Sequence, residues 1–384
     1  MVPVFTESPV PLHIDPCYPH DRQRFAIGCI GAGFIMRDCH LVAYQQAGFR
    51  TLGIASRRPE QAEEVARLRG IPRVYRDYRE LLRDPEIQVV DIAVPPDVQA
   101  EVIREIVHHA DHIRGILAQK PLGVNFAQAY QIVQWCRQAG VVLVVNQNMR
   151  YDQSIRAASS LLRQGVLGQP VLATIEMRAI PHWMPWQQRQ GWVTLRIMSI
   201  HHLDTFRYWF GNPQRIYVSF RADPRTERKF PHEDGIVLSI LEYADGLRAS
   251  CWDDVWSGPA REGAAADLGI RWRIEGTEGL AQGTIGWHRY PQHCPSTLEF
   301  TSTHYGECWF RPQWDQAWFP EAFAGPMAEL LMALESGTSP ALSGEDNLHT
   351  MALVDAGYRA AREQRAVSPQ EIFCAFEASD HPSA

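Results

Sequence analysis

The sequence contains no apolar stretch that approaches the roughly 20 unbroken residues needed to cross a lipid bilayer. Its first 24 residues hold several prolines and no apolar core, so a cleaved secretion signal is not expected there either. These two absences argue against membrane-spanning and secreted classes of protein. We therefore expect no membrane partner.

Cysteine pairs of the kind that bind zinc or crosslink small secreted proteins are also missing. The chain has eight cysteines, but they are scattered and none forms a Cys-x-x-Cys pair. This spacing fits neither a disulfide framework nor a thiolate zinc site. We expect a reducing, cytoplasmic location and no bound metal.

An excess of basic residues is absent as well. Lys and Arg number 37 against 44 Asp and Glu, which gives a net charge of −7. Nucleic acids and anionic membranes are bound through basic surfaces, so neither is an expected partner. A local basic pocket for a phosphorylated small molecule remains compatible with this balance.

What the sequence does contain is a regular β/α alternation after a Pro-rich arm at residues 1–24. Strands of five or six continuous apolar residues, separated by helical segments, indicate parallel crossovers in a sheet covered on both faces. The expected strands are 25–30, 49–55, 89–94, 113–118 and 141–145. Residues 25–148 are therefore predicted to form a Rossmann-type, doubly wound α/β domain.

The pattern changes from residue 149 onward. Alternating strands with hairpin turns, such as the one at Asp245-Gly246, are interrupted by a helix over 201–210 and followed by helices at 327–334 and 346–362. Residues 149–384 are predicted to form an α+β domain on an open, mostly antiparallel sheet. The 384 residues suffice for two domains, and no internal repeat is visible.

A glycine-rich turn follows the first predicted strand. Gly31 permits a tight turn, and Gly33 lets the backbone approach a pyrophosphate at the N-terminus of the helix that begins at Phe34 and Ile35. Met36 replaces the usual third small residue. The strand–turn–helix context favours a dinucleotide site over a plain glycine turn.

The end of the second strand is where such domains select their dinucleotide. An acidic residue there would bind the ribose hydroxyls, but this chain has Ser56, Arg57 and Arg58. A hydroxyl beside two guanidinium groups suits a 2′-phosphate, which favours NADP(H) while NAD(H) stays possible. The alternative is that both arginines are merely solvated.

A lysine follows the strand at 113–118, at the carboxyl edge of the sheet where ligands of open α/β folds bind. Partial desolvation lowers the pKa of an amine, so Lys120 in Gln119-Lys120-Pro121 is a candidate proton donor and acceptor. A Lys-Pro pair is more often a surface turn, and only its position makes this one a candidate.

A fourth feature lies on the helix over 201–210. His201 and Asp204 are three residues apart and share a helix face, so the carboxylate can orient or charge the imidazole. The adjacent His202 suggests a metal cluster, but neighbouring helical residues diverge and no further ligand is evident. A histidine packed against the sheet is the alternative.

With these features in order, residues 25–370 resemble the glucose-fructose oxidoreductase/inositol dehydrogenase (Gfo/Idh/MocA) family. Gln119-Lys120-Pro121 matches the family's Glu-Lys-Pro, which implies a catalytic Lys120, and His201 and Asp204 match its His-x-x-Asp. Asn148-Met149-Arg150-Tyr151 and Ser343-Gly344-Glu345-Asp346-Asn347 are similar to the segment between the domains and to the C-terminal signature.

Two positions depart from the family pattern. Many members carry an aspartate one turn before the histidine, where this chain has Ile197 beside Arg196. The loop beginning with Pro95 and Pro96, which we assign to the cofactor site, has Gln99 where a histidine is common. The fold assignment is unaffected, but the proton relay is expected to differ.

The resemblance implies an NAD(P)-dependent oxidoreductase that transfers a hydride to or from a sugar, cyclitol or related polyol, with Lys120 as general acid/base. Two alternatives remain: a glycoside-cleaving enzyme that recycles a tightly bound dinucleotide, and a non-catalytic dinucleotide sensor. Family members assemble through the open sheet, which predicts a homodimer or homotetramer. The expected substrate-binding residues are Arg150, Tyr151, His182, Trp183, Arg196 and His202.

Overall fold

The computed structural model describes residues 2–181, 184–256, 267–289 and 291–380, and the chain divides into two compact units. The parallel-sheet unit consists of residues 16–151 and 319–351, and the nine-stranded unit consists of the described parts of 1–15, 152–318 and 352–384. Each unit is therefore built from separate stretches of the sequence.

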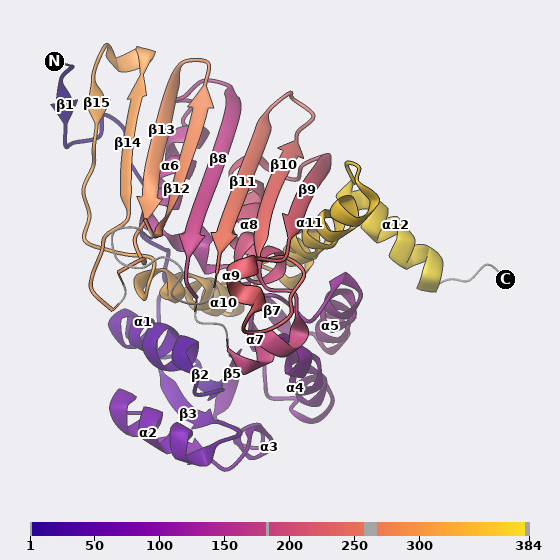
Figure 1. The fold of residues 1–384 in the computed structure, drawn as a ribbon. Helices are drawn as coiled ribbons and strands as arrows, with labels where there is room; N and C mark the ends of the chain where they lie inside the picture. The colour runs from indigo at the N-terminus through magenta and orange to yellow at the C-terminus, as the bar shows by residue number, and fades with distance from the viewer. Residues whose placement is uncertain (1, 182–183, 257–266, 290, 381–384) are drawn as a thin grey trace. The chain divides into compact units, whose positions relative to one another are not determined.

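The parallel-sheet unit contains a six-stranded sheet in which every neighbouring pair is parallel (Figure 1). The strand order is β4-β3-β2-β5-β6-β7. The strands are β2 (Ala26–Ile30), β3 (Thr51–Ala55), β4 (Arg73–Tyr75), β5 (Ile87–Ile92), β6 (Gly115–Gln119) and β7 (Val142–Asn146). The predicted doubly wound parallel sheet is confirmed.

Helices cover both faces of this sheet, as continuous apolar strands require. On one face, α10 packs so closely against β6 that a Cβ at Gly115 would meet Leu330 and Leu334. On the other face, Val133 of α5 and Leu143 of β7 both lie within 3.2 Å of where a Cβ at Gly344 would be. The helices are η1 (Ile35–His40, a π-helix), α1 (Leu41–Ala47), α2 (Pro59–Arg69), α3 (Tyr78–Leu81), α4 (Pro96–His109), α5 (Phe126–Ala139), η2 (Asn148–Tyr151), η6 (Glu321–Phe323) and α10 (Ala324–Ser336).

The nine-stranded unit is built on a sheet of order β1-β15-β14-β13-β12-β8-β11-β10-β9. Its pairs are antiparallel except β8–β11 and β1–β15, which are parallel. The strands are β1 (Val4–Phe5), β8 (Pro170–Ala179), β9 (Arg215–Arg221), β10 (Ile236–Glu242), β11 (Arg248–Val255), β12 (Gly269–Gly276), β13 (Gly279–Ile285), β14 (Thr297–Ser302) and β15 (Trp309–Phe310). The predicted mostly antiparallel sheet is confirmed.

Helices α6 and α8 of this unit lie behind the sheet in the view of Figure 1. The helices of the unit are α6 (Gln153–Arg163), α7 (Pro185–Gln190), η3 (Leu195–Ser199), α8 (Ile200–Phe210), α9 (Pro224–Glu227), η5 (Thr303–Tyr305), α11 (Gly344–Glu363) and α12 (Pro369–Asp380). Helix α11 begins in the stretch assigned to the parallel-sheet unit and ends in the nine-stranded unit.

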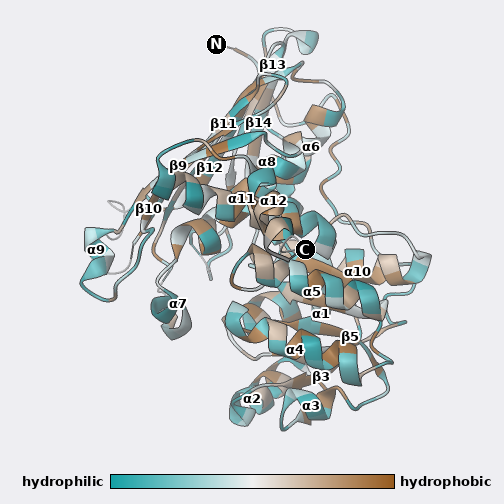
Figure 2. Cartoon of the chain, turned by 90° about the vertical axis from the view of Figure 1, so that its right-hand side faces the viewer, coloured by the Kyte–Doolittle hydropathy of each residue, from teal (hydrophilic) through white to brown (hydrophobic). Residues whose placement is uncertain are grey.

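Side chains along these strands alternate between a buried and an open face. On β10, Val237 and Leu241 are buried while Leu238 and Ile240 are about half exposed, at 52% and 49%. The hydropathy of each residue along the strands and helices is shown in Figure 2. One face of the sheet therefore forms the core of the unit, and among the described residues side chains such as Leu238 and Ile240 stay exposed on the other.

The start of the Pro-rich arm adds an edge strand to the large sheet. Residues 4 and 5 form β1, which pairs in parallel with β15, and the ring of Phe5 stacks on Phe310 with centroids 5.8 Å apart. Farther along, the amide of His13 donates to Ser160 Oγ at 3.0 Å. The start of the arm is thus tied to a strand and a helix of its own unit.

No helix among the described residues is both long and apolar enough to cross a membrane. All eight cysteines are free thiols.

Candidate functional site

The glycine turn after β2 has the geometry of a dinucleotide cradle. Gly31 has a φ of +109°, and a Cβ there would come within 2.4 Å of the carbonyl oxygen of Ala93, so only glycine is tolerated. A Cβ at Gly33 would have no atom of the chain within 4 Å. Packing therefore does not explain Gly33, whereas close approach of a pyrophosphate does. The turn fits the cofactor that the sequence predicts.

Helix η1 begins immediately after this turn. The amide of Arg37 donates to the carbonyl of Gly33 at 2.8 Å, which leaves the preceding amides of the first turn available to a ligand. Phe34 is exposed and its ring lies 6.4 Å from that of Phe319, while Ile35 is half-buried.

The three residues predicted to select the dinucleotide lie at the carboxyl end of β3. Arg57 and Arg58 are exposed, and no carboxylate among the described residues pairs with either of them. Ser56 is half-buried, and its Oγ accepts from the amide of Arg58 at 3.3 Å. Two unpaired cations therefore stand where a ribose or its phosphate would be recognised.

Pro95 and Pro96 lead from β5 into α4, at the same carboxyl edge of the sheet. Pro95 is the N-cap with an extended backbone and Pro96 is the first helical residue, a position that suits proline because its missing N–H would be unpaired in any case. Gln99, one turn on, is fully buried and donates to the carbonyl of Gln119 at 2.8 Å.

Lys120 follows β6 directly, and its side chain is half-buried. Loss of hydration lowers the pKa of its amine from the usual 10.5 to about 7. Its amide donates to Gln119 Oε1 at 3.0 Å. A base poised near neutral pH at this edge suits general acid/base chemistry.

In the nine-stranded unit, His201 and Asp204 occupy α8, as predicted. His201 is 5% exposed and its ring meets that of Trp318 edge-on, with centroids 5.2 Å apart. Asp204 is buried and lies 3.4 Å from the guanidinium of Arg207. Both side chains are therefore buried on this helix.

His202 faces the sheet from the same helix. Its Nδ1 lies 2.9 Å from a carboxylate oxygen of Asp253 on β11, and both side chains are buried. Together with Cys251 they form one group whose ligand atoms lie within 4.8 Å of one another. His202 and Asp253 face each other within this group, and burial raises the pKa of the Cys251 thiol, which favours its neutral form.

Arg196 precedes α8 in η3 and is 6% exposed. Its guanidinium pairs with Asp355 at 2.6 Å and lies 5.0 Å from the ring centroids of both Trp192 and Tyr358. Ile197, which stands at the position of the missing aspartate, is buried at 4%. Arg196 is therefore already engaged within its own unit.

The remaining predicted substrate residues lie elsewhere. Arg150 is buried in η2 and pairs with Asp346 at 2.8 Å, within the parallel-sheet unit. The ring of Tyr151 packs directly on Gly325, where a Cβ would come within 2.1 Å of it. His182 and Trp183 lie outside the described residues.

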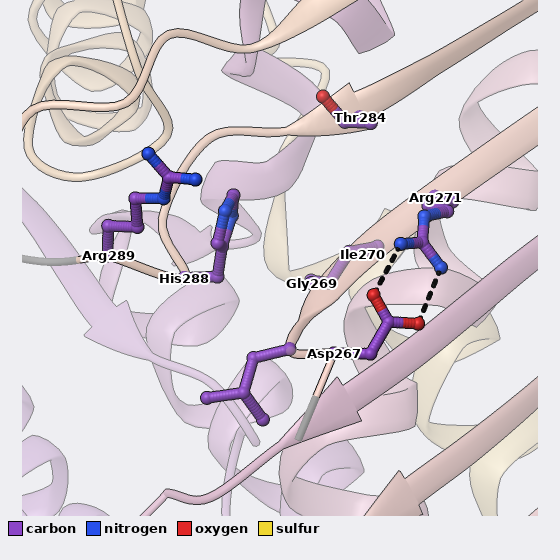
Figure 3. A pocket seen from close by; sticks show the side chains of 8 residues that line it. Asp267, Gly269, Ile270, Arg271, Thr284, His288 and Arg289 are labelled. Atoms are coloured by element: carbon purple, nitrogen blue, oxygen red, sulfur yellow. Dashed lines mark hydrogen bonds and ion pairs between the residues drawn. The ribbon is translucent and has the colours of Figure 1, made fainter. Parts of the chain in front are cut away.

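A cavity of about 500 Å³ opens at one end of β12 and β13 (Figure 3). Arg271 pairs with Asp267 there through both guanidinium nitrogens, and the burial of His288 together with the charges of Arg289 and Arg271 lowers its pKa. Its lining residues are Asp267, Leu268, Gly269, Ile270, Arg271, Thr284, His288 and Arg289. None of them was predicted as a site residue.

A buried polar cluster that the sequence analysis missed lies beside the lysine turn. His40 Nδ1 is 2.7 Å from Asp91 Oδ2, and Tyr44 donates to the same oxygen at 2.7 Å. On its other side, His40 Nε2 is 2.9 Å from the amide nitrogen of Asn146 and 3.3 Å from that of Gln119. The sequence offered one signal for this cluster, which is the aspartate at position 91 within an apolar strand. A charge buried there requires polar partners.

A glycine turn after a parallel strand, with an amine of lowered pKa at the same edge of the sheet, is typical of oxidoreductases that use a nicotinamide dinucleotide. The chain matches the model of the oxidoreductase family with an NAD-binding Rossmann fold over residues 25–147 and that of the family's C-terminal α/β domain over residues 159–368. It therefore belongs to the Gfo/Idh/MocA family, and the resemblance found in the sequence is confirmed.

Several curated relatives match most of the chain. D-apiose dehydrogenase of Paraburkholderia graminis is 27% identical, with 91% of each chain covered. 1,5-Anhydro-D-fructose reductase of Ensifer adhaerens is 25% identical, with 88% of this chain and 97% of that protein covered. Among solved structures, levoglucosan dehydrogenase in complex with NADH and levoglucosan shares the fold with a TM-score of 0.75 at 20% identity, over 90% of this chain and 99% of that chain.

Proposed function

We propose that the protein is a dehydrogenase or reductase of a sugar, cyclitol or related polyol, with Lys120 as its general acid/base. The supporting observation is the amine at the carboxyl end of β6, whose pKa is lowered to about 7 by burial. When bound, the nicotinamide exchanges a hydride with the substrate carbon. The chain must handle the accompanying hydroxyl proton, and an amine that titrates near neutrality can do so.

The other roles follow the same chemistry. In the oxidative direction neutral Lys120 accepts the hydroxyl proton, and in reduction its protonated form returns it. We assign a hydrogen bond to a substrate hydroxyl to His201, with Asp204 buried on the same helix. The predicted substrate contacts of Arg150, Tyr151, His182, Trp183, Arg196 and His202 remain predictions.

For the cofactor we propose a preference for NADP(H) over NAD(H). The two unpaired, exposed guanidinium groups of Arg57 and Arg58 and the adjacent Ser56 suit a 2′-phosphate, and the chain places no carboxylate at the end of β3. Relatives of similar fold have been solved with NAD⁺ or NADH, so both cofactors are to be compared directly.

The direct test is a substrate panel followed at 340 nm. D-Apiose, levoglucosan, 1,5-anhydro-D-fructose, myo-inositol and trans-dihydrodiols represent the substrates in the names of relatives and similar structures. Each is offered with either cofactor, to wild type and to Lys120→Met. Turnover by wild type that is lost in the variant supports the proposal, and equal turnover by both contradicts it.

The same wild-type and Lys120→Met proteins also test the two alternative functions, a glycoside-cleaving enzyme and a non-catalytic dinucleotide sensor. A glycoside-cleaving enzyme would retain its dinucleotide through dialysis and return it unchanged after turnover. A sensor would bind the dinucleotide equally well with Lys120 or Met at position 120 and show no turnover. A dehydrogenase exchanges its cofactor and accumulates its reduced or oxidised form in proportion to substrate consumed.

We also propose that the chain forms a homodimer or homotetramer through the open face of the nine-stranded sheet. Leu238 and Ile240 on β10 and Tyr217 on the adjacent β9 are each at least 40% exposed, and so is Leu172 on β8, which β11 separates from β10. Exposed apolar side chains gathered on one face of a sheet are typical of a protein–protein interface.

A further inference from the structure

The buried cluster around His40 has a defined direction of hydrogen bonding that ends at the backbone of Lys120. Asp91 is fully buried in the apolar core between the sheet and α1, so its carboxylate requires donors. Tyr44 supplies one through its hydroxyl, and His40 supplies the other through Nδ1–H. His40 Nε2 must then act as an acceptor if the ring is neutral.

The amide of Gln119 agrees with that assignment. Its Oε1 accepts from the backbone amide of Lys120 at 3.0 Å, so its nitrogen is the atom that faces His40 Nε2. Asn146 presents its own amide nitrogen to the same imidazole atom at 2.9 Å. Both amides donate, and the neutral Nδ1–H tautomer of His40 satisfies every one of these contacts.

The strands explain why these residues meet. Asn146 and Gln119 are register partners on β7 and β6, and Asp91 on β5 is the partner of Leu117, two residues before Gln119. In parallel strands these positions share one face of the sheet, the face that η1 and α1 cover. His40, the last residue of η1, thus links the helix after the glycine turn to the strand end that carries the lysine.

We propose that the buried His40–Asp91 pair positions Lys120 for proton transfer through the side chain of Gln119, which must be an amide to do so. This inference rests on the proposed role of Lys120. Gln99 holds the same turn from the other side, donating to the carbonyl of Gln119 at 2.8 Å and accepting from the amide of Gly123 at 3.3 Å. The backbone on both sides of the lysine is therefore fixed by buried polar groups.

The proposal also explains the departure of Gln119 from the glutamate of the family motif. A carboxylate at this position has no N–H to offer His40 Nε2, so it would require a proton on that nitrogen and hence an imidazolium. The ionisable groups facing the cluster are Cys29 from β2, Asp91 from β5, Tyr44 from α1 and His40 itself. With Gln119 the cluster holds one negative charge, and the lysine has no carboxylate as its immediate chain neighbour.

Three variants test the proposal. Gln119→Met keeps the volume but removes both hydrogen bonds, and Gln119→Glu replaces the donor by a charge. Cys39→Ala is the matched control, because Cys39 is equally buried in η1 but lies beside Asp38 and Arg69 rather than the cluster. For wild type and each variant, the ¹⁵N signals of the His40 imidazole report its protonation, and His40→Gln identifies which signals belong to it. The second measurement is the pH profile of kcat and KM on the polyol of the panel that wild type turns over best.

We expect wild type to show the Nδ1–H tautomer of His40 and Gln119→Glu to show a doubly protonated ring. Gln119→Met should lower kcat about tenfold or more at nearly constant KM, since displacement of a catalytic group by about 1 Å is costly. Cys39→Ala should stay within about twofold of wild type.

An Nε2–H tautomer in wild type, an unchanged kcat in Gln119→Met, or an equal loss in Cys39→Ala would each overturn the positioning role. If wild type turns over no polyol, the proposed function fails instead. The imidazole spectra then still decide the hydrogen-bond direction on which the positioning depends.

Discussion

At the scale of single residues, the chemistry converges on one amine. The chain has two lysines, Lys120 and Lys229, and only Lys120 follows a strand of the parallel sheet. Replacing Lys120 by Met should lower kcat by about 10²–10⁴-fold, the usual contribution of a general acid/base, and leave dinucleotide affinity within about threefold. Stopped-flow turnover and fluorescence titration with reduced cofactor measure the two quantities. Lys229→Met, at an exposed site, is the matched control and should be unchanged.

The pH dependence follows from the same residue. Oxidation requires the neutral amine, so its rate should rise with pH through about 7 and then level off. Reduction requires the protonated amine, so its rate should fall over the same range. Initial rates in both directions across pH 5 to 10 decide this, and an oxidation profile that is flat between pH 6 and 9 would contradict the assignment.

The two glycines of the turn, Gly31 and Gly33, should respond oppositely to replacement by alanine. Gly31→Ala should destabilise the fold, because its Cβ would clash with the carbonyl of Ala93 and its φ is positive. Gly33→Ala should leave the melting temperature within about 2 °C and weaken dinucleotide binding at least tenfold, because its Cβ meets nothing but the ligand's space. Calorimetry and cofactor titration of both variants give the comparison. Equal binding by Gly33→Ala and wild type would contradict the cradle.

At the scale of helices and strands, the helix that carries His201 is held at its start by Asp234. The carboxylate of Asp234 accepts from the amides of Val193 and Leu195 and from the hydroxyl of Tyr358, each at 2.7 Å. It is buried, so the loss of a donor leaves a charge less well satisfied. These hydrogen bonds therefore fix the backbone at the start of η3, from which α8 continues.

Tyr358→Phe removes one of these three bonds without changing the shape of the ring. The free energy of unfolding should fall by about 1–3 kcal/mol, the cost of removing one partner of a buried polar group. Urea denaturation measures this change. Tyr305→Phe, on an exposed ring of the same unit, is the control and should stay within about 0.5 kcal/mol of wild type. A Tyr358→Phe protein as stable as that control would show that the carboxylate finds another donor.

The strands of the parallel sheet were predictable because burial on both faces leaves a continuous apolar signature. β2 and β6 begin and end within two residues of their predicted limits. Strand β13 carries two glycines and little alternation, and β15 has two residues, so neither was predicted. The return of residues 319–351 to the parallel-sheet unit was also not foreseen, since a helical pattern does not say which sheet the helix covers.

Site residues were predictable only where a chemically suitable residue directly follows a strand in the sequence. The glycine turn and Lys120 each follow a strand, so a single sequence reveals them. The link from Asp91 to His40 spans 51 residues, and nothing local announces it. Similarly, Arg196 was predicted to contact the substrate, but its guanidinium pairs with Asp355, which lies 159 residues farther along the chain. A pairing at that distance in sequence leaves no local signal.

At the scale of the whole molecule, the proposed oligomer interface is the exposed face of the large sheet. Leu238 and Ile240 project from β10 on that face, about half exposed. Leu238→Glu with Ile240→Lys should convert an oligomer to monomers, because both charges would have to be desolvated in the interface. Light scattering after size-exclusion chromatography gives the mass. A wild-type monomer, or an oligomer unaffected by both changes, would contradict the proposed interface.

The central claim is that Lys120 is a base poised near neutrality, and its titration tests that claim most directly. With only two lysines, protein labelled with ¹³C at the lysine Cε gives two signals, and Lys120→Met identifies the one that belongs to Lys120. The account predicts that the shift of this signal follows a pKa of about 7. A pKa above 10, as in an ordinary hydrated lysine, would contradict it.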